Sequence, residues 1–239
     1  MSKALTLILL PALFTVIGGA LVVFVNISKR LLIFIYHFSA GLVLGIVGIE
    51  LVPEFIKHDL EWLIILIFVV GGAFFILVDW LTDYVRETLG VSGDKKSPWA
   101  IFAGLTVDLL SDGMLIASGS TIGNLGFPLA VATAVVAFPE AFTSNAAFKR
   151  RGWRGWKLVA LSFVQGILMI LGVPIGYFIV HGRPQIYTYS VLSFTAGFLS
   201  VLLAEEVLPR AHQGSEARLG AFLFLLGFAA VAMVSSYIG

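Results

Sequence analysis

Eight long apolar segments dominate the sequence and decide what kind of fold the chain can adopt. They lie near residues 4–26, 31–56, 62–85, 98–122, 126–148, 157–180, 186–210 and 216–238. Each is close to the ~20 residues that an α-helix needs to cross a bilayer. Because the short connections use up nearly all remaining residues, we predict a single all-α transmembrane domain over residues 1–239 with no separate soluble domain.

Composition supports this class and excludes others. Only 12% of the residues are charged, whereas a soluble domain has roughly a quarter. The absence of cysteine excludes disulfides and thiolate metal sites. The net charge of +1, without any basic stripe, predicts no nucleic-acid partner.

Lysine and arginine are distributed unevenly between the two sides of the predicted bundle. Twelve of them fall in or beside the connections between spans 1–2, 3–4, 5–6 and 7–8, and three fall on the other side. By the positive-inside rule the first set is cytoplasmic. The chain is therefore expected to be a multi-pass protein of the cell (inner) membrane with both termini on the extracytoplasmic side.

Two segments resemble each other, "HFSAGLVLGIVGIELVPEF" at 37–55 and "SFTAGFLSVLLAEEVLPRA" at 193–211. Their alignment pairs Gly41 with Gly197, Glu50 with Glu206, and Pro53 with Pro209. Spans 2 and 7 cross in opposite directions, so we predict an inverted repeat of spans 1–3 and 6–8 around central spans 4 and 5. A fainter match of "VDLLSDG" with "VVAFPEA" relates spans 4 and 5. Such repeats are typical of secondary transporters, although short Ala/Gly/Leu/Val strings can also match by chance.

Acidic residues at membrane depth are the main candidates for function. Each costs about 2.5–3.5 kcal/mol at a span centre on insertion scales. The deepest are Asp108, Asp112, Glu140, Glu205 and Glu206, and Glu50 and Asp79 are possible accessory positions. Lysine and arginine are missing from the middles of the spans, so no built-in countercharge is expected. Protonation or a bound cation is then required.

Asp108 and Asp112 lie four residues apart and therefore share one helix face, roughly 6 Å apart along the axis. A divalent cation between them would remove their repulsion, while a shared proton would make them a structural pair. Glu140 follows Pro139, which leaves a backbone carbonyl free in the preceding turn. Gln165 offers an oxygen at similar depth, or else an interhelical hydrogen bond. His212 is read first as a loop residue, although it lies just beyond Glu205 and Glu206.

With these motifs the chain resembles the ZIP (Zrt/Irt-like protein) family of divalent metal ion transporters, as a divergent member. The resemblance covers eight spans, outside termini and acids on spans 4 and 5. It rests on "SAGLVLGIVGIELVPE", "GGAFFILVDWL", "SFTAGFLSVLLAEEVLPRAH" and "GAFLFLLGFAAVAMV". It implies alternating-access transport toward the cytoplasm, a homodimer, and no enzymatic activity or resident cofactor.

The metal motifs of the family are altered in this chain. On span 4, "DLLSDG" puts Asp108 where a histidine is usual, Leu109 for asparagine and Ser111 for proline, and keeps the acid as Asp112. On span 5 only Pro139 and Glu140 of the motif remain.

The resemblance further matches Gln165 to a glutamate on span 6, and Glu205 and Glu206 to a His-Glu pair on an exit path. Leu109 and Ala137 stand at second-metal positions and cannot coordinate. One central metal is therefore expected, held by Asp108, Asp112, Glu140 and Gln165. An all-oxygen set shifts preference from Zn²⁺ toward Mn²⁺ or Fe²⁺.

Two other functions remain open from the sequence. A proton-coupled carrier of a non-metal solute would use the buried acids as a proton relay. A di-aspartyl membrane hydrolase fits less well, because such dyads come from two facing chain segments that share a proton, whereas Asp108 and Asp112 lie on one helix.

Overall fold

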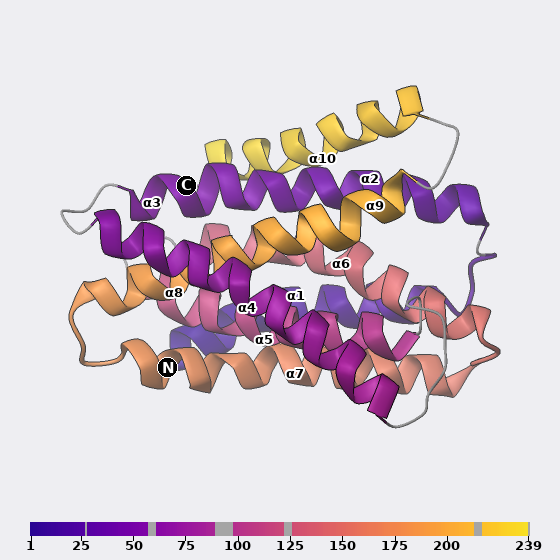
Figure 1. Ribbon diagram of the computed structural model, residues 1–239, viewed down its shortest axis with the longest axis horizontal. Helices are drawn as coiled ribbons and strands as arrows, with labels where there is room; N and C mark the ends of the chain where they lie inside the picture. Colours follow the sequence, from indigo (N-terminus) through magenta and orange to yellow (C-terminus); the bar gives the residue numbers. More distant parts are fainter. Residues whose placement is uncertain (27, 57–60, 89–97, 122–125, 213–216, 239) are drawn as a thin grey trace.

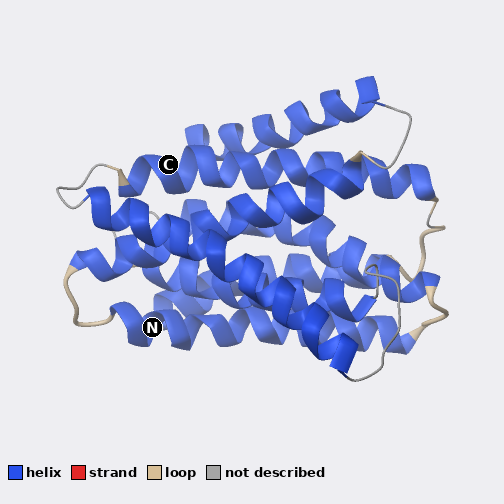
Figure 2. Ribbon diagram, in the orientation of Figure 1, coloured by secondary structure: helices blue, strands red, loops and turns tan. Residues whose placement is uncertain are grey.

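The computed structural model describes residues 1–26, 28–56, 61–88, 98–121, 126–212 and 217–238. These residues form a bundle of long helices lying side by side, and no strand occurs among them (Figure 2). The helices are α1 (Ser2–Leu21), α2 (Lys29–Gly45), α3 (Val52–Phe55), α4 (Glu61–Thr88), α5 (Pro98–Gly119), α6 (Gly126–Arg150), α7 (Trp156–Val180), α8 (Gln185–Leu202), α9 (Leu208–Ala211) and α10 (Ala217–Ile238). Two wider, π-helical turns, η1 (Ile46–Leu51) and η2 (Leu203–Val207), join α2 to α3 and α8 to α9.

These elements match the eight apolar segments expected from the sequence, with α2–η1–α3 and α8–η2–α9 each forming one long rod. In the described part of the chain, seven helical stretches are long and apolar enough to cross a membrane by length and composition. Helix α5 has 22 residues, which is also a spanning length. The prediction of an all-helical, multi-pass membrane protein is confirmed at this level.

The two termini lie toward the same end of the bundle (Figure 1). The opposite end, which we call the basic end, carries the α1–α2 and α6–α7 connections with Lys29, Lys149 and Lys157. Lys149 closes the end of α1, because its Nζ donates to the carbonyls of Val22 at 2.7 Å and Val25 at 2.9 Å. A lysine suits this position, since the last carbonyls of a helix lack intrahelical donors and carry partial negative charge.

Helices α2 and α10 pack backbone against backbone at two glycines. Gly41 of α2 faces the carbonyl of Phe224 on α10, and Gly227 of α10 faces the carbonyl of Phe38 on α2. A Cβ atom at either glycine would overlap the opposing carbonyl. Small residues allow such approach in membranes, where packing and not water exclusion holds helices together.

Helices α4 and α8 pair through the same arrangement. Gly197 of α8 faces the carbonyl of Phe68, and Gly71 of α4 faces the carbonyl of Phe194. In all four cases the phenylalanine stands three residues before a glycine of its own helix. The α2–α10 and α4–α8 pairs thus use one Phe-x-x-Gly pattern.

Between these pairs, α1 packs on α6 and α5 packs on α7. Gly18 of α1 faces the carbonyl of Phe138 on α6, and Gly113 of α5 lies against Gly172 of α7. Gly113 directly follows Asp112, so this contact fixes the part of α5 that carries both aspartates.

The π-helical turns occur at related places in the two long rods. Glu50 lies in η1 with Pro53 in the next turn, and Glu205 lies in η2 followed by Pro209. Proline cannot donate to the carbonyl four residues earlier and its ring crowds that carbonyl. A wider turn accommodates this mismatch, and π-turns of this kind often coincide with functional positions.

The glycine contacts lead to a stability prediction. We expect Gly41→Ala to destabilise the protein by about 1–3 kcal/mol, because its Cβ would enter the space of the Phe224 carbonyl and force α2 and α10 apart. The matched control is Gly48→Ala on the same rod, where a Cβ would meet nothing within 4 Å. Thermal unfolding of the detergent-solubilised variants measures the difference. Equal stability of the two variants would contradict the proposed packing.

Candidate metal site

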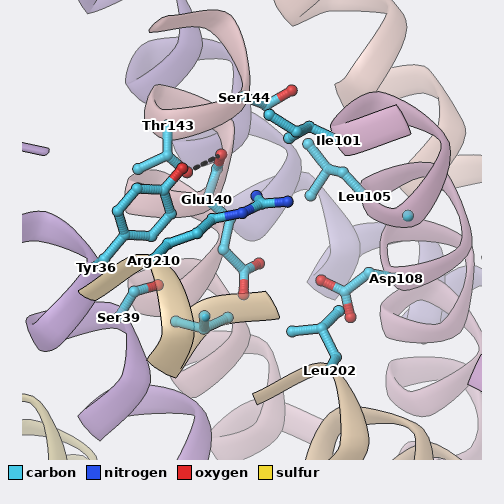
Figure 3. A pocket seen from close by; sticks show the side chains of 12 residues that line it. Tyr36, Ser39, Ile101, Leu105, Asp108, Glu140, Thr143, Ser144, Leu202 and Arg210 are labelled. Carbon is cyan, nitrogen blue, oxygen red and sulfur yellow. Dashed lines mark hydrogen bonds between the residues drawn. The ribbon is translucent and has the colours of Figure 1, made fainter. Parts of the chain in front are cut away.

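A small cavity of about 50 Å³ lies between α2, α5, α6 and the η2–α9 segment. Its lining is Tyr36, Ser39, Ile101, Gly104, Leu105, Asp108, Glu140, Thr143, Ser144, Leu202, Val207 and Arg210 (Figure 3). A single water needs roughly 10–15 Å³ of such space. The cavity therefore has room for an ion with a few waters.

Two carboxyl groups point into this cavity from different helices, that of Asp108 from α5 and that of Glu140 from α6 (Figure 3). Asp108 is 2% exposed and Asp112, one turn further along α5, is 5% exposed. Asp112 does not line the cavity. The three groups are nevertheless close enough for each to act electrostatically on the others. When ionised, they repel one another in a low-dielectric setting.

Local backbone structure around Glu140 follows from Pro139. The proline lies inside α6 and has no N–H to donate to the carbonyl of Val135. One turn later, the Thr143 hydroxyl donates to the Glu140 carbonyl at 2.9 Å. In the described residues no backbone N–H, amide or alcohol group donates to the Glu140 carboxylate. This carboxylate is therefore available to a ligand in the cavity.

Arg210 reaches into the same cavity from α9 (Figure 3). Its guanidinium also lies 6.0 Å from the centre of the Tyr36 ring. A positively charged side chain from near the end of a span therefore lines the same cavity as Asp108 and Glu140, which the expectation of no built-in countercharge did not include. In the two similar segments, 37–55 and 193–211, Arg210 follows Pro209 at the position where Glu54 follows Pro53. From the sequence, this arginine was not recognised as a residue of the cavity.

Gln165 is fully buried on α7 but does not line the cavity. Its Nε2 donates to Asn145 Oδ1 at 3.1 Å and to Ser144 Oγ at 3.3 Å, both on α6. Asn145 Nδ2 in turn donates to Ser162 Oγ at 2.8 Å on α7. The Gln165 carbonyl oxygen has no hydrogen-bond partner among the described residues. The side chain thus joins α6 to α7 and contacts the cavity wall through Ser144.

The other candidate residues lie away from the cavity. Glu205 is exposed, and the side chain of Glu206 lies outside the described residues. Glu50 is buried in η1 within hydrogen-bond reach of the Ser235 hydroxyl on α10, and Asp79 is exposed on α4.

His212 lies beside His37 of α2. The rings of His37 and His212 have centroids 5.5 Å apart, and Nδ1 of His212 lies 2.8 Å from the Leu208 carbonyl. Across the described part of the chain, no three His, Asp or Glu side chains are already arranged as a metal-binding group.

The positions matched to a second metal are filled by apolar packing. Leu109 and Ala137 are fully buried and belong to a cluster with Ile8, Met169 and Val173. These contacts join α1, α5, α6 and α7 beside the carboxylates. The side chains at these two positions are therefore packed among apolar neighbours and have no ligand atoms of their own.

Comparison with known proteins gives one relative. Over 96% of its length the chain is 26% identical to the zinc transporter ZupT of Chlorobium limicola, 96% of which is covered. No protein-family model matches the chain. This near full-length similarity to a zinc transporter supports the resemblance to the ZIP family that was drawn from the motifs, with the chain as a divergent member. The roles of individual residues in this chain stay predictions.

The buried amide network gives a second stability prediction. We expect Asn145→Leu to destabilise this protein by about 1–3 kcal/mol, because it removes the three buried hydrogen bonds that Asn145 makes to Gln165, to Ser162 and to the Leu158 carbonyl. Ser236→Ala removes an exposed hydroxyl on α10 that bonds only its own helix and should change stability by less than about 0.5 kcal/mol. Thermal unfolding compares them. If both variants unfold at the same temperature, the network does not hold α6 to α7.

Proposed function

We propose that this protein is a secondary transporter that moves divalent metal cations across the membrane toward the cytoplasm by alternating access. The observation that carries the proposal is the near full-length similarity to a protein named as a zinc transporter. Inside the bundle, two carboxyl groups meet in a cavity of ion size. We infer that Asp108, Asp112 and Glu140 bind the ion, and that Gln165 contributes through its carbonyl oxygen.

Charge and ligand chemistry support a divalent cation as substrate. Two carboxylates that line one low-dielectric cavity are matched by one doubly charged ion. Carboxylate and amide oxygens suit hard ions such as Mn²⁺ and Fe²⁺, and carboxylate also binds Zn²⁺. A transported ion has to leave its site again, so we expect it to bind few protein ligands and to keep some of its waters. The substrate is therefore taken to be a Zn-, Mn- or Fe-type ion.

The inverted repeat of spans 1–3 and 6–8 is part of this proposal. Its support is the shared Phe-x-x-Gly contact in the α2–α10 and α4–α8 pairs, together with the two π-helical turns followed by proline. In repeat-based carriers one set of helices rocks or slides against another around a central site. Here the α2–α10 and α4–α8 pairs would move relative to the inner helices α1, α5, α6 and α7.

The direction of transport follows from the orientation that we infer. With the basic end in the cytoplasm, the termini are extracytoplasmic in the cell (inner) membrane, and η2 lies on the cytoplasmic side of the cavity. Glu205 and Glu206 would then receive the ion on its exit. We take the working assembly to be a homodimer, which cross-linking in membranes can test.

One observation favours the alternative, a proton-coupled carrier of a non-metal solute. Arg210 provides positive charge in the cavity without any metal, so the acids do not depend on a cation for compensation. That alternative predicts proton flux coupled to an organic substrate and no response to added metal. Uptake assays with and without metal separate the two functions.

The central prediction concerns the acids. Asp112→Asn and Glu140→Gln should each lower metal uptake into proteoliposomes by more than about tenfold, since each removes a charged ligand. Asp79→Asn, an exposed acid outside the cavity, is the matched control and should keep parental uptake. Parental rates in both Asp112→Asn and Glu140→Gln would show that the site is assigned to the wrong residues.

A further prediction concerns selectivity. Asp108→His would place an imidazole where the family usually has one, and nitrogen ligands favour Zn²⁺ over Mn²⁺. The ratio of Zn²⁺ to Mn²⁺ uptake, measured in competition, should therefore rise relative to the parent. An unchanged or lower ratio would mean that Asp108 does not contact the transported ion.

A further inference from the structure

The cavity is lined by a positively charged side chain of the protein itself, that of Arg210. Of the residues that line it, Asp108 and Glu140 carry formal negative charges and Arg210 carries the positive one. The guanidinium points into the cavity, as do the two carboxyl groups (Figure 3). Arginine stays protonated in proteins, so its charge is lost from the cavity only if the side chain moves out.

The surroundings of Arg210 leave its side chain a way out of the cavity. It belongs to the short α9, which follows the widened η2 turn and Pro209 near the basic end of the bundle. It is only half-buried, and the ring of Tyr36, which also lines the cavity, lies 6.0 Å from its guanidinium. Tyrosine faces attract guanidinium groups. The side chain can therefore rotate away from the acids toward the basic end while the guanidinium stays close to Tyr36.

We propose that the Arg210 guanidinium is a tethered counter-ion that occupies the Asp108–Glu140 cavity when no metal ion is present and withdraws when one binds. This inference rests on the proposed metal transport. It assigns Arg210 as a positioning residue that competes with the substrate. Uncompensated charges inside a membrane protein are costly. With Arg210 in the cavity, the empty carrier can change conformation while the two negative charges of Asp108 and Glu140 are partly balanced.

The competition has two measurable consequences. Removing the guanidinium should tighten metal binding, because the ion no longer displaces a bound cation. Net uptake should slow, since each cycle then requires the empty site to reorient with its acids uncompensated. Metal–metal exchange requires only the loaded carrier to reorient, so it should persist. A guanidinium that merely held the fold together would not separate net uptake from exchange.

The experiment compares the parent with Arg210→Gln, Arg210→Lys and the control Arg183→Gln. Arg183 also lies over a tyrosine ring, that of Tyr187 at 5.0 Å, but it is absent from the cavity. Mn²⁺ affinity is measured on purified protein, and net Mn²⁺ uptake and Mn²⁺–Mn²⁺ exchange are measured in proteoliposomes. We expect Arg210→Gln to bind Mn²⁺ about tenfold more tightly, within the usual 5–150-fold range for coupled binding events, and to lose net uptake but not exchange.

Arg210→Lys should fall between the parent and Arg210→Gln, and Arg183→Gln should match the parent. Because the chain has no cysteine, Arg210→Cys provides a single thiol for a second test on one folded sample. Attaching an aminoethyl group through a methanethiosulfonate reagent should restore weaker binding and net uptake, whereas the neutral methylthio group should not.

The outcomes separate the two proposals. If the parent neither binds nor exchanges Mn²⁺ or Zn²⁺, the proposed function fails and the counter-ion proposal fails with it. If the parent exchanges metal, and Arg210→Gln keeps both the parental affinity and the parental ratio of net uptake to exchange, only the counter-ion proposal is overturned. Should Arg210→Gln not fold, the charged and neutral adducts of Arg210→Cys decide, and identical behaviour of the two adducts overturns it.

Discussion

Close backbone contact at glycine is the constraint on which this bundle depends. Lipid tails are as apolar as leucine, so helices gain little by hiding hydrocarbon from them and must associate through tight packing. Gly41, Gly197 and Gly113 each face the backbone of a neighbouring helix, and no larger residue fits there without separating the pair. The contact at Gly113 has a second effect, because it holds α5 against α7 and fixes where Asp112 and Asp108 lie relative to α6. Packing and site geometry are thus set by the same residues.

The residues that form each helix could be predicted from the sequence, whereas the helix that each one packs against could not. The spans follow from hydropathy and from charged or glycine-rich breaks, since a bilayer of fixed thickness imposes a length on each helix. The partners follow from which face of each helix carries a glycine opposite a backbone carbonyl, and this depends on two helices at once. The repeat suggested that Gly41 and Gly197 correspond. It did not predict that one contacts α10 and the other α4. The sequence did not predict the π-helical turns at Glu50 and Glu205 either, although Pro53 and Pro209 lie close to them.

The site shows the same division between local and tertiary information. Spacing of four residues was enough to place Asp108 and Asp112 on one helix face, and Pro139 marked the backbone hydrogen bond that is missing in the turn before Glu140. Gln165 is fully buried. Its hydrogen bonds to Asn145 and Ser144 needed the structure, because they depend on the facing rotation of α6 and α7. Arg210 was missed for a related reason: hydropathy assigns a residue near a span end to the surface, but a long side chain on the short helix after a widened turn can point inward.

Taken together, the departures from the family's metal motifs describe a site with altered charge as well as altered ligands. Leu109 and Ala137 are buried in an apolar cluster, so the proposed site has one cavity and no second ion. If Asp108 is a ligand, it puts a negative charge where the family usually has a neutral ligand, which would strengthen the attraction for any cation and make release harder. Arg210 acts in the opposite direction. With the guanidinium present, the formal imbalance of the two lining carboxylates falls from two charges to one. On the proposed mechanism an incoming ion would have to displace this charge and would bind less tightly. The carboxylate of Asp108 and the guanidinium of Arg210 would then offset each other, which would keep affinity in the range that a carrier, as opposed to a storage protein, requires.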